Sequence, residues 1–232
     1  MPKKISDIRR AEIVDALYDA IRDDGISLPS YDQIARKGDM SRQLVRHYYR
    51  DAEQIAVDLC DRLAETYRDH LTRGVLHAEP AARLRVLLDF YFDRLSGKGL
   101  AKPKDDAVYD ALFALAGVSE RVHAKLREQY VELMRTLSRE LHLAHPDLPR
   151  VACRELAYLV VTQMCGHWKM KATLGMVADD AVPREAIDRL IASYAAGYES
   201  RGDDPFGGAL DDAANDDASA STQSETVVVA AP

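Results

Sequence analysis

The chain has 232 residues, of which 47% are hydrophobic, and a net charge of −7. This length and apolar content suffice for one large domain or for a small domain joined to a larger one, and they exclude a chain too polar to bury a core. The net charge of the whole chain argues against nucleic-acid binding, but the acidic residues are unevenly distributed along the sequence. Residues 201–232 carry one basic and seven acidic residues, whereas residues 1–50 carry ten basic and eight acidic residues. Local charge governs phosphate contact, so the N-terminal part remains compatible with DNA.

The cysteines and the hydropathy pattern indicate a cytoplasmic protein. The cysteines are odd in number and show no close pairing pattern, which predicts reduced thiols at Cys60, Cys153 and Cys165. No apolar run approaches the roughly 18 residues of a membrane-spanning helix. The first ten residues lack the apolar stretch of a signal peptide. We therefore expect no membrane partner.

A first helix is predicted to end at Gly25, a residue that favours helix termination. Its apolar residues recur at helical spacing, at Ile13, Val14, Leu17 and Ile21. The residues that precede this helix and those of its first turns form a basic start, with Lys3, Lys4, Arg9 and Arg10. This basic start could be an arm close to DNA phosphates or simply a solvated terminus, and the sequence leaves both interpretations open.

The stretch 30–49 predicts two short helices joined by a tight turn. Ser30 can cap the first helix, with Gln33 at the position that completes a capping box. Ser41 can cap the second helix. Gly38 and Asp39 form the turn, with Met40 packed beneath it. The inward residues are predicted to be Ile34, Ala35, Val45 and Tyr48. This spacing is typical of a helix-turn-helix, whose second helix enters the major groove of DNA.

The outward face of the second short helix consists of hydrogen-bond donors. These residues are Arg42, Gln43, Arg46 and His47. Arginine can pair with guanine through two hydrogen bonds, and glutamine can pair with adenine in the same way. A plain helical hairpin, which needs only the caps and the turn, is the alternative interpretation.

A family resemblance rests on two segments that flank the predicted turn, S-Y-D-Q-I-A and S-R-Q-L-V-R-H-Y-Y-R-D-A-E-Q-I. Over about residues 6–60 the chain resembles the N-terminal domain of TetR-type repressors. Two departures stand out: Asp39-Met40 replaces the usual Gly-Val, and Ala52 replaces a lysine that often touches phosphate. The resemblance implies an all-α protein with a DNA-binding domain over 1–50 and an effector-binding and dimerisation domain over 51–200. It implies a homodimer on an operator in double-stranded DNA, where Arg42, Gln43 and Arg46 read bases. The residues expected mainly to hold phosphates are Ser30, Tyr31, Ser41, His47 and Tyr48.

The rest of the chain to residue 200 predicts helices only. Asp51 is expected to cap a long helix that ends near Arg73. Further helices are predicted over 80–96, 104–116, 119–142, 149–174 and 183–200, with Ser119 as the cap of the third and Pro183 at the start of the last.

The helix predicted over 149–174 is apolar on more than one side. One row is Leu156, Val160, Met164 and Met170, and a second is Tyr158, Val161, Cys165 and Trp168. Such a helix is covered on several sides, which suggests a core on one face and a second subunit on another. The run G-H-W-K-M-K-A-T-L-G is similar to a stretch of BetI-like regulators within the TetR family. If that likeness extends to the ligand, a small cation held by aromatic rings is implied.

Seven side chains of the body form the predicted wall of an effector pocket, because ligand sites in helical proteins lie between helices. They are Tyr91, Phe92, Tyr109, Phe113, Met164, His167 and Trp168. Ordinary core packing is the alternative for each of them. We find no catalytic constellation, and we expect no cofactor and no metal.

The sequence therefore predicts a ligand-responsive transcriptional regulator, a repressor that a small-molecule effector releases from its operator. One alternative is a helical small-molecule carrier or enzyme whose hairpin is only structural. Another is an interaction adaptor that uses the acidic tail, residues 201–232, which we expect to be disordered.

Overall fold

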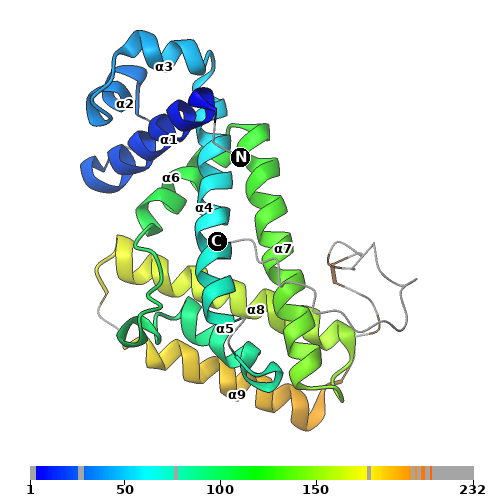
Figure 1. The fold of residues 1–232 in the computed structure, drawn as a ribbon. Helices are drawn as coiled ribbons and strands as arrows, with labels where there is room; N and C mark the ends of the chain where they lie inside the picture. The colour runs from blue at the N-terminus through cyan, green and yellow to red at the C-terminus, as the bar shows by residue number, and fades with distance from the viewer. Residues whose placement is uncertain are drawn as a thin grey trace. The chain divides into compact units, whose positions relative to one another are not determined.

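The computed structural model describes residues 4–25, 29–75, 78–176 and 179–199, together with Gly202, Pro205, Phe206 and Leu210. These residues form helices and connecting turns, and no strand occurs among them, which confirms the all-α prediction (Figure 1). The α-helices are α1 (Ile5–Asp24), α2 (Tyr31–Lys37), α3 (Arg42–Tyr48), α4 (Ala52–Val75), α5 (Arg83–Tyr91), α6 (Asp106–Ala116), α7 (Glu120–Ala144), α8 (Arg150–Trp168) and α9 (Ala181–Gly197).

The chain divides into two compact units. Unit 1 consists of the described residues of 1–66 and 104–129, and unit 2 of those of 67–103 and 130–210. Both α4 and α7 therefore contribute residues to each unit. The predicted boundary at residue 50 differs from this division, since unit 1 also takes in the first part of α4, all of α6 and the start of α7.

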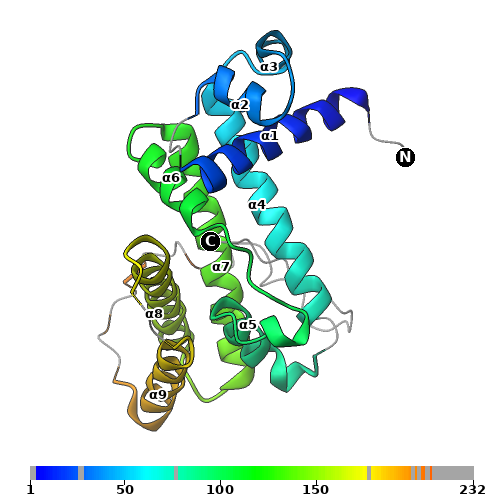
Figure 2. The same cartoon turned by 90° about the vertical axis from the view of Figure 1, so that its left-hand side faces the viewer.

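In unit 1, α1 is the central helix against which its neighbours pack. It contacts α2, α3 and α6, and Figures 1 and 2 both place α2 and α3 on the same side of α1. Ile13, Leu17 and Ile21 of α1 are buried, as their helical spacing predicted. Gly25 ends α1 in a left-handed conformation, with φ of 65°, and its N–H donates to the carbonyl of Ile21. Glycine adopts this conformation without the steric cost that a Cβ imposes.

In unit 2, α8 and α9 lie side by side (Figure 2). A partly buried ion pair contributes to this unit: Arg184 of α9 is 7% exposed and donates from Nε to Asp89 at 2.8 Å. Aromatic rings fill the core between α4 and α5, where Tyr67 stacks on Tyr91 with ring centroids 6.1 Å apart. Tyr67 and Tyr91 are both fully buried.

The helix predicted over 80–96 is shorter than expected. A 3-10 turn, Pro80–Ala82, precedes α5, which ends at Tyr91. Asp93 then takes φ of 52°, and its carboxylate accepts a hydrogen bond from the backbone N–H of Lys102 at 2.9 Å. Phe92 and Leu95 are nevertheless buried. Their apolar side chains therefore belong to a turn that packs into the core, and they do not indicate a longer helix.

The last two predicted helices also differ at their ends. The α-helical part of 149–174 stops at Trp168 and continues as a π-helical turn, Lys169–Thr173. Helix α9 begins at Ala181, so Pro183 lies inside its first turn and does not open the helix. Proline is tolerated there because the first N–H groups of a helix have no acceptor within it.

The predicted tail, 201–232, lies outside the described residues except at Gly202, Pro205, Phe206 and Leu210. Leu210 is 5% exposed, so its side chain is buried against the protein, while the disorder expected of the tail stays a prediction. The ring of Phe206 lies 5.6 Å from that of Tyr158 on α8. The described residues include no helix that combines the length and the apolar character needed to cross a membrane.

Alkylation is expected to distinguish the three free thiols. Cys60 and Cys153 are fully buried, and burial raises their pKa values to about 12 and about 11, whereas Cys165 is partly exposed. Because the thiolate is the reactive species, iodoacetamide at pH 8 should modify Cys165 well before the other two. Peptide mass spectrometry over time measures this order, and urea-denatured protein, in which all three should react alike, is the control. Equal rates for Cys60 and Cys165 in folded protein would contradict the expectation.

Candidate DNA-contacting site

The start of α2 is fixed by a complete capping box. The Ser30 hydroxyl accepts a hydrogen bond from the Gln33 N–H, and the Gln33 side chain accepts one from the Ser30 N–H at 2.8 Å. Two backbone donors at the helix start are thereby satisfied, as the sequence predicted. The position of the first short helix therefore follows from its own residues.

The turn between α2 and α3 also has the predicted structure. Asp39 takes φ of 48°, a left-handed conformation that aspartate adopts more readily than most residues. A Cβ at Gly38 would lie 2.9 Å from the Cβ of Ala16 and still closer to the Met40 side chain, so the turn requires glycine. The Ser41 hydroxyl then accepts from the Leu44 N–H at 3.1 Å and caps α3.

Helix α3 has one buried and one exposed face. Val45 is fully buried. The four predicted donors, Arg42, Gln43, Arg46 and His47, are all exposed. The predicted inner position of Val45 and the predicted outer positions of the four donors are therefore confirmed. Contact of the donors with DNA remains a prediction.

The inward tyrosine at the end of α3 is Tyr49, and the prediction of Tyr48 for this role is wrong. Tyr49 is 1% exposed, whereas Tyr48 is only partly buried. The reason is that α3 ends at Tyr48, and Tyr49 has extended φ and ψ of −131° and 106°, so the helical spacing no longer sets its direction. Tyr48 remains a candidate for phosphate contact, together with His47, against whose ring it packs edge-on.

Tyr49 joins α3 to α1 and α4 through polar contacts. Its hydroxyl donates to Asp58 at 2.6 Å, and the guanidinium of Arg10 lies 4.7 Å from its ring centroid. Gln54 donates to the other oxygen of Asp58 at 2.6 Å. Burial, followed by the hydrogen bond to Asp58, raises the pKa of Tyr49, so the phenol stays protonated in the physiological range. This cluster holds the end of α3 in a fixed position.

Two of the predicted base-reading arginines already contact side chains of α2. Arg42 forms an ion pair with Asp32 at 3.0 Å, and both groups are about half exposed. The guanidinium of Arg46 lies 5.8 Å from the ring centroid of Tyr31. Ser30 and Tyr31, predicted to hold phosphates, thus lie at the start of the helix that packs beside α3. The separation of ten residues between Asp32 and Arg42 follows no spacing rule that predicts this ion pair.

Replacing Asp32 with asparagine should strengthen DNA binding by about two- to fivefold, because Arg42 would lose a competing partner and a negative charge would leave the surface predicted to face DNA. Titration of labelled duplex at a fixed salt concentration measures the effect. Asp39→Asn is the matched control, since it removes the same charge from the turn and keeps a residue that tolerates a positive φ. Weaker binding by Asp32→Asn would contradict the prediction.

A concavity of about 380 Å³ lies where the end of α3 meets the starts of α4 and α7. Its cationic lining comprises Arg10, Arg50 and Arg121, and its other polar residues include His47 and Tyr48. Arg121 donates to Asp51 at 2.5 Å and also contacts Gln54. The sequence analysis missed Arg50 and Arg121 as candidates for phosphate contact. Arg121 lies about seventy residues after α3 in the sequence and belongs to no recognisable motif. Arg50, in contrast, could have been predicted as a basic residue that closely follows α3.

The residues predicted to line an effector pocket do not all occur in one unit. Tyr91, Phe92, Met164, His167 and Trp168 belong to unit 2, where the Trp168 indole donates to the Tyr91 carbonyl at 2.9 Å. The rings of Phe92 and His167 lie 6.1 Å apart.

The remaining two predicted residues, Tyr109 and Phe113, lie on α6 in unit 1, and Phe113 is 47% exposed. The structure therefore brings together Tyr91, Phe92, His167 and Trp168, and it places Met164 in the same unit. The effector site itself remains a prediction.

The ring of Trp168 already has two cationic neighbours from the chain itself. The ammonium of Lys102 lies 4.6 Å from a Trp168 ring centroid and that of Lys171 lies 5.1 Å away. Lys171 also pairs with Asp180 at 2.5 Å. A small cationic effector at this indole would have to displace one of these lysines, which weakens the case for a cation site here.

No protein-family model matches the chain. In sequence it is 28% identical over 199 residues to the HTH-type transcriptional regulator BetI of an Escherichia coli strain, a match that covers 84% of this chain and 98% of that protein. The BetI regulator of Klebsiella pneumoniae is 26% identical over the same coverage.

Solved structures show the same fold. A putative transcriptional regulator from Pseudomonas aeruginosa superposes with a TM-score of 0.69 at 14% identity, over 84% of this chain and 94% of that one. A TetR transcription regulator from Haloarcula marismortui superposes with a TM-score of 0.65 at 20% identity, over 82% and 97%.

Fold and site together define a helix-turn-helix protein with the TetR-type fold. Within that class the chain is similar to the BetI regulators along most of its length. The resemblance predicted from the N-terminal segment and from the Gly166–Ala172 stretch is thus confirmed.

Proposed function

We propose that this chain is a ligand-responsive DNA-binding transcriptional regulator, acting as a repressor that leaves its operator when an effector binds. The observation that carries the proposal is the outer face of α3. It presents four exposed donors on a short helix whose inner face, caps and end are all fixed by neighbouring residues. A rigidly held helix with exposed donors suits base contact in the major groove.

On DNA, Arg42, Gln43 and Arg46 read base edges. Ser30, Tyr31, Ser41, His47 and Tyr48 hold phosphates and set the orientation of α3. Phosphate contacts position a protein on the duplex, whereas base contacts give sequence specificity. The arginines around the 380 Å³ concavity extend the phosphate-contacting surface beyond α3.

The protein acts as a homodimer, whose two recognition helices enter successive major grooves about 34–36 Å apart. Exposed apolar residues on α8 and α9, including Tyr158 and Val182, support a subunit contact at these helices. A ligand that binds one arrangement of the subunits better than another shifts the population and so changes DNA affinity. The three free thiols support a place in the cytoplasm, and the similarity to BetI transcriptional regulators supports a role other than catalysis.

The test is a titration of the purified full-length chain against duplex DNA from the region beside its own gene, compared with random duplex, over a series of salt concentrations. Specific binding should be clearly tighter than random binding, and both should weaken as salt rises, because phosphate contacts release counterions. Equal affinity for the two duplexes, or an affinity that salt does not change, would refute the proposal.

A helical small-molecule carrier is the second candidate. Deletion of residues 1–50 separates the two: a carrier keeps its principal activity, whereas a regulator loses DNA binding. Deletion of 201–232 tests the adaptor alternative, because an adaptor that works through its acidic tail would lose its activity and a regulator would lose little.

A further inference from the structure

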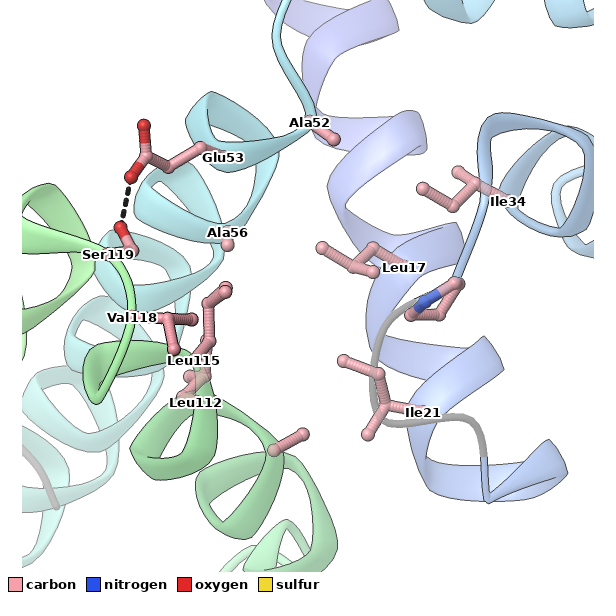
Figure 3. Close-up of a pocket in the computed structure, with 12 residues that line it drawn as sticks. Leu17, Ile21, Ile34, Ala52, Glu53, Ala56, Leu112, Leu115, Val118 and Ser119 are labelled. Carbon is pink, nitrogen blue, oxygen red and sulfur yellow. Dashed lines mark hydrogen bonds between the residues drawn. The ribbon is translucent and has the colours of Figure 1, made fainter.

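Unit 1 contains a pocket of about 250 Å³ that none of the residues assigned to DNA contact lines. Figure 3 shows its two apolar walls. Leu17, Ile21 and Ile34 extend from α1 and α2, and Leu112, Leu115 and Val118 face them from α6 and the turn that follows it. Apart from Glu53 and Ser119, every residue that lines the pocket is apolar. A dry cavity of 150 Å³ with such a lining is large enough to bind benzene, so this pocket can hold a somewhat larger molecule.

One edge of the pocket is polar. The Ser119 hydroxyl donates to the Glu53 carboxylate and accepts from the Val122 N–H at 3.1 Å, so its own donor is used (Figure 3). The second Glu53 oxygen accepts from Arg121 at 3.2 Å. A carboxylate offers about four acceptor positions, so Glu53 can still accept from a ligand. The edge therefore suits a hydrogen-bond donor and disfavours an anion.

We propose that this pocket binds a small, uncharged molecule with an apolar body and a single O–H or N–H group that donates to Glu53. A cation is the poorer match, because the apolar walls would leave its charge without solvation and the guanidinium of Arg121 already lies beside the carboxylate. The pocket is separate from the five aromatic, histidine and methionine residues of unit 2 predicted to bind an effector.

The location of the pocket gives it a regulatory role. Its occupant touches α1 and α2, which carry and support the recognition helix, and at the same time α4 and α6. If the ligand and DNA favour different spacings of these walls, each weakens the binding of the other by the same factor. This regulatory part rests on the proposed DNA-binding function, whereas ligand binding does not.

The probe is 4-propylphenol, titrated into the full-length protein by isothermal calorimetry, with 4-propylanisole as the matched compound that lacks the donor. We expect saturable binding with one molecule per chain and an affinity about tenfold weaker for the anisole, since a hydrogen bond to a charged acceptor is lost. Absence of binding up to millimolar concentration, or equal affinity for the two compounds, would overturn the proposal.

Two variants locate the site. Ala111→Leu places a larger side chain inside the pocket from α6, and Ala52→Leu does so from the exposed start of α4. Each should weaken binding of the phenol about tenfold or more. Ala114→Leu, an exposed position on α6 outside the pocket, is the control and should bind normally. If Ala111→Leu does not fold, Ala52→Leu decides, and normal binding by a folded pocket variant overturns the assignment.

The same titration in the presence of specific duplex tests the regulatory part. We expect the phenol to change DNA affinity by about fivefold or more, and this change to disappear in Ala52→Leu. Ligand binding without any change in DNA affinity would overturn the regulatory part alone. If the protein binds no specific DNA at all, the proposed function fails, while the calorimetric result still decides on the pocket.

Discussion

Replacement of Tyr49 with alanine is expected to lower the free energy of unfolding by about 3–5 kcal/mol, the range measured for large aromatic side chains in cores. Tyr49 is 1% exposed, and its ring lies beneath the guanidinium of Arg10. Its loss leaves a cavity and also removes the hydroxyl that donates to Asp58. Since whole domains are stable by only about 5–15 kcal/mol, the recognition helix should lose its fixed position.

Urea unfolding followed by far-ultraviolet circular dichroism measures this effect. Tyr48→Ala is the matched control, because the neighbouring tyrosine is only partly buried and should cost much less stability. Tyr49→Phe keeps the ring and removes only the hydroxyl, so it should cost about 0.5–1.5 kcal/mol, because Asp58 loses one donor but is 26% exposed and keeps the hydrogen bond from Gln54. A Tyr49→Ala protein as stable as Tyr48→Ala would contradict the assignment of Tyr49 to the core.

Features that depend on neighbouring residues were predictable from the sequence. The capping box of Ser30, the cap by Ser41 and the left-handed Asp39 involve residues within three positions of one another. Local chemistry decides such features, because a side chain can reach the backbone donors of the next turn whatever the remaining chain does. These features suffice to define the helix-turn-helix.

Helix ends were the least predictable part, because a periodic pattern does not show where the periodicity stops. The pattern through Phe92 and Leu95 suggested continuous helix, yet Asp93 leaves the helical conformation and accepts from the Lys102 backbone, nine residues later. The prediction that Tyr48 faces inward was wrong for the same reason. One residue beyond a helix end, an extended backbone turns the side chain inward irrespective of helical spacing.

The sites built from distant segments could not be predicted at all. Arg121 reaches the start of α4 across about seventy residues of sequence, to Asp51 and Glu53. The 250 Å³ pocket combines residues of α1, α2, α4 and α6 that each look like ordinary core in a helical pattern. Only the packing of these helices shows that their apolar side chains leave a space between them.

Replacement of Arg46 with alanine should weaken binding to the specific duplex by about 1–3 kcal/mol and bring it closer to the affinity for random duplex, provided that Arg46 reads a base. Arg46 is exposed on α3 one position after the buried Val45, which fixes the helix face that it occupies. Arg46→Lys should recover only part of the loss, since lysine keeps the charge but cannot form the paired hydrogen bonds of a guanidinium. Titrations with both duplexes at one salt concentration give the two affinities for each variant.

Arg36→Ala supplies the comparison that separates base contact from charge. Arg36 is an exposed arginine of α2, in the same unit as α3 and outside the set predicted to read bases, and its removal takes away the same charge. It should weaken specific and random binding by similar factors, because a phosphate contact carries no sequence information. If Arg46→Ala also weakens both equally, Arg46 is a phosphate contact, and Arg42 and Gln43 remain as the base-reading residues of α3.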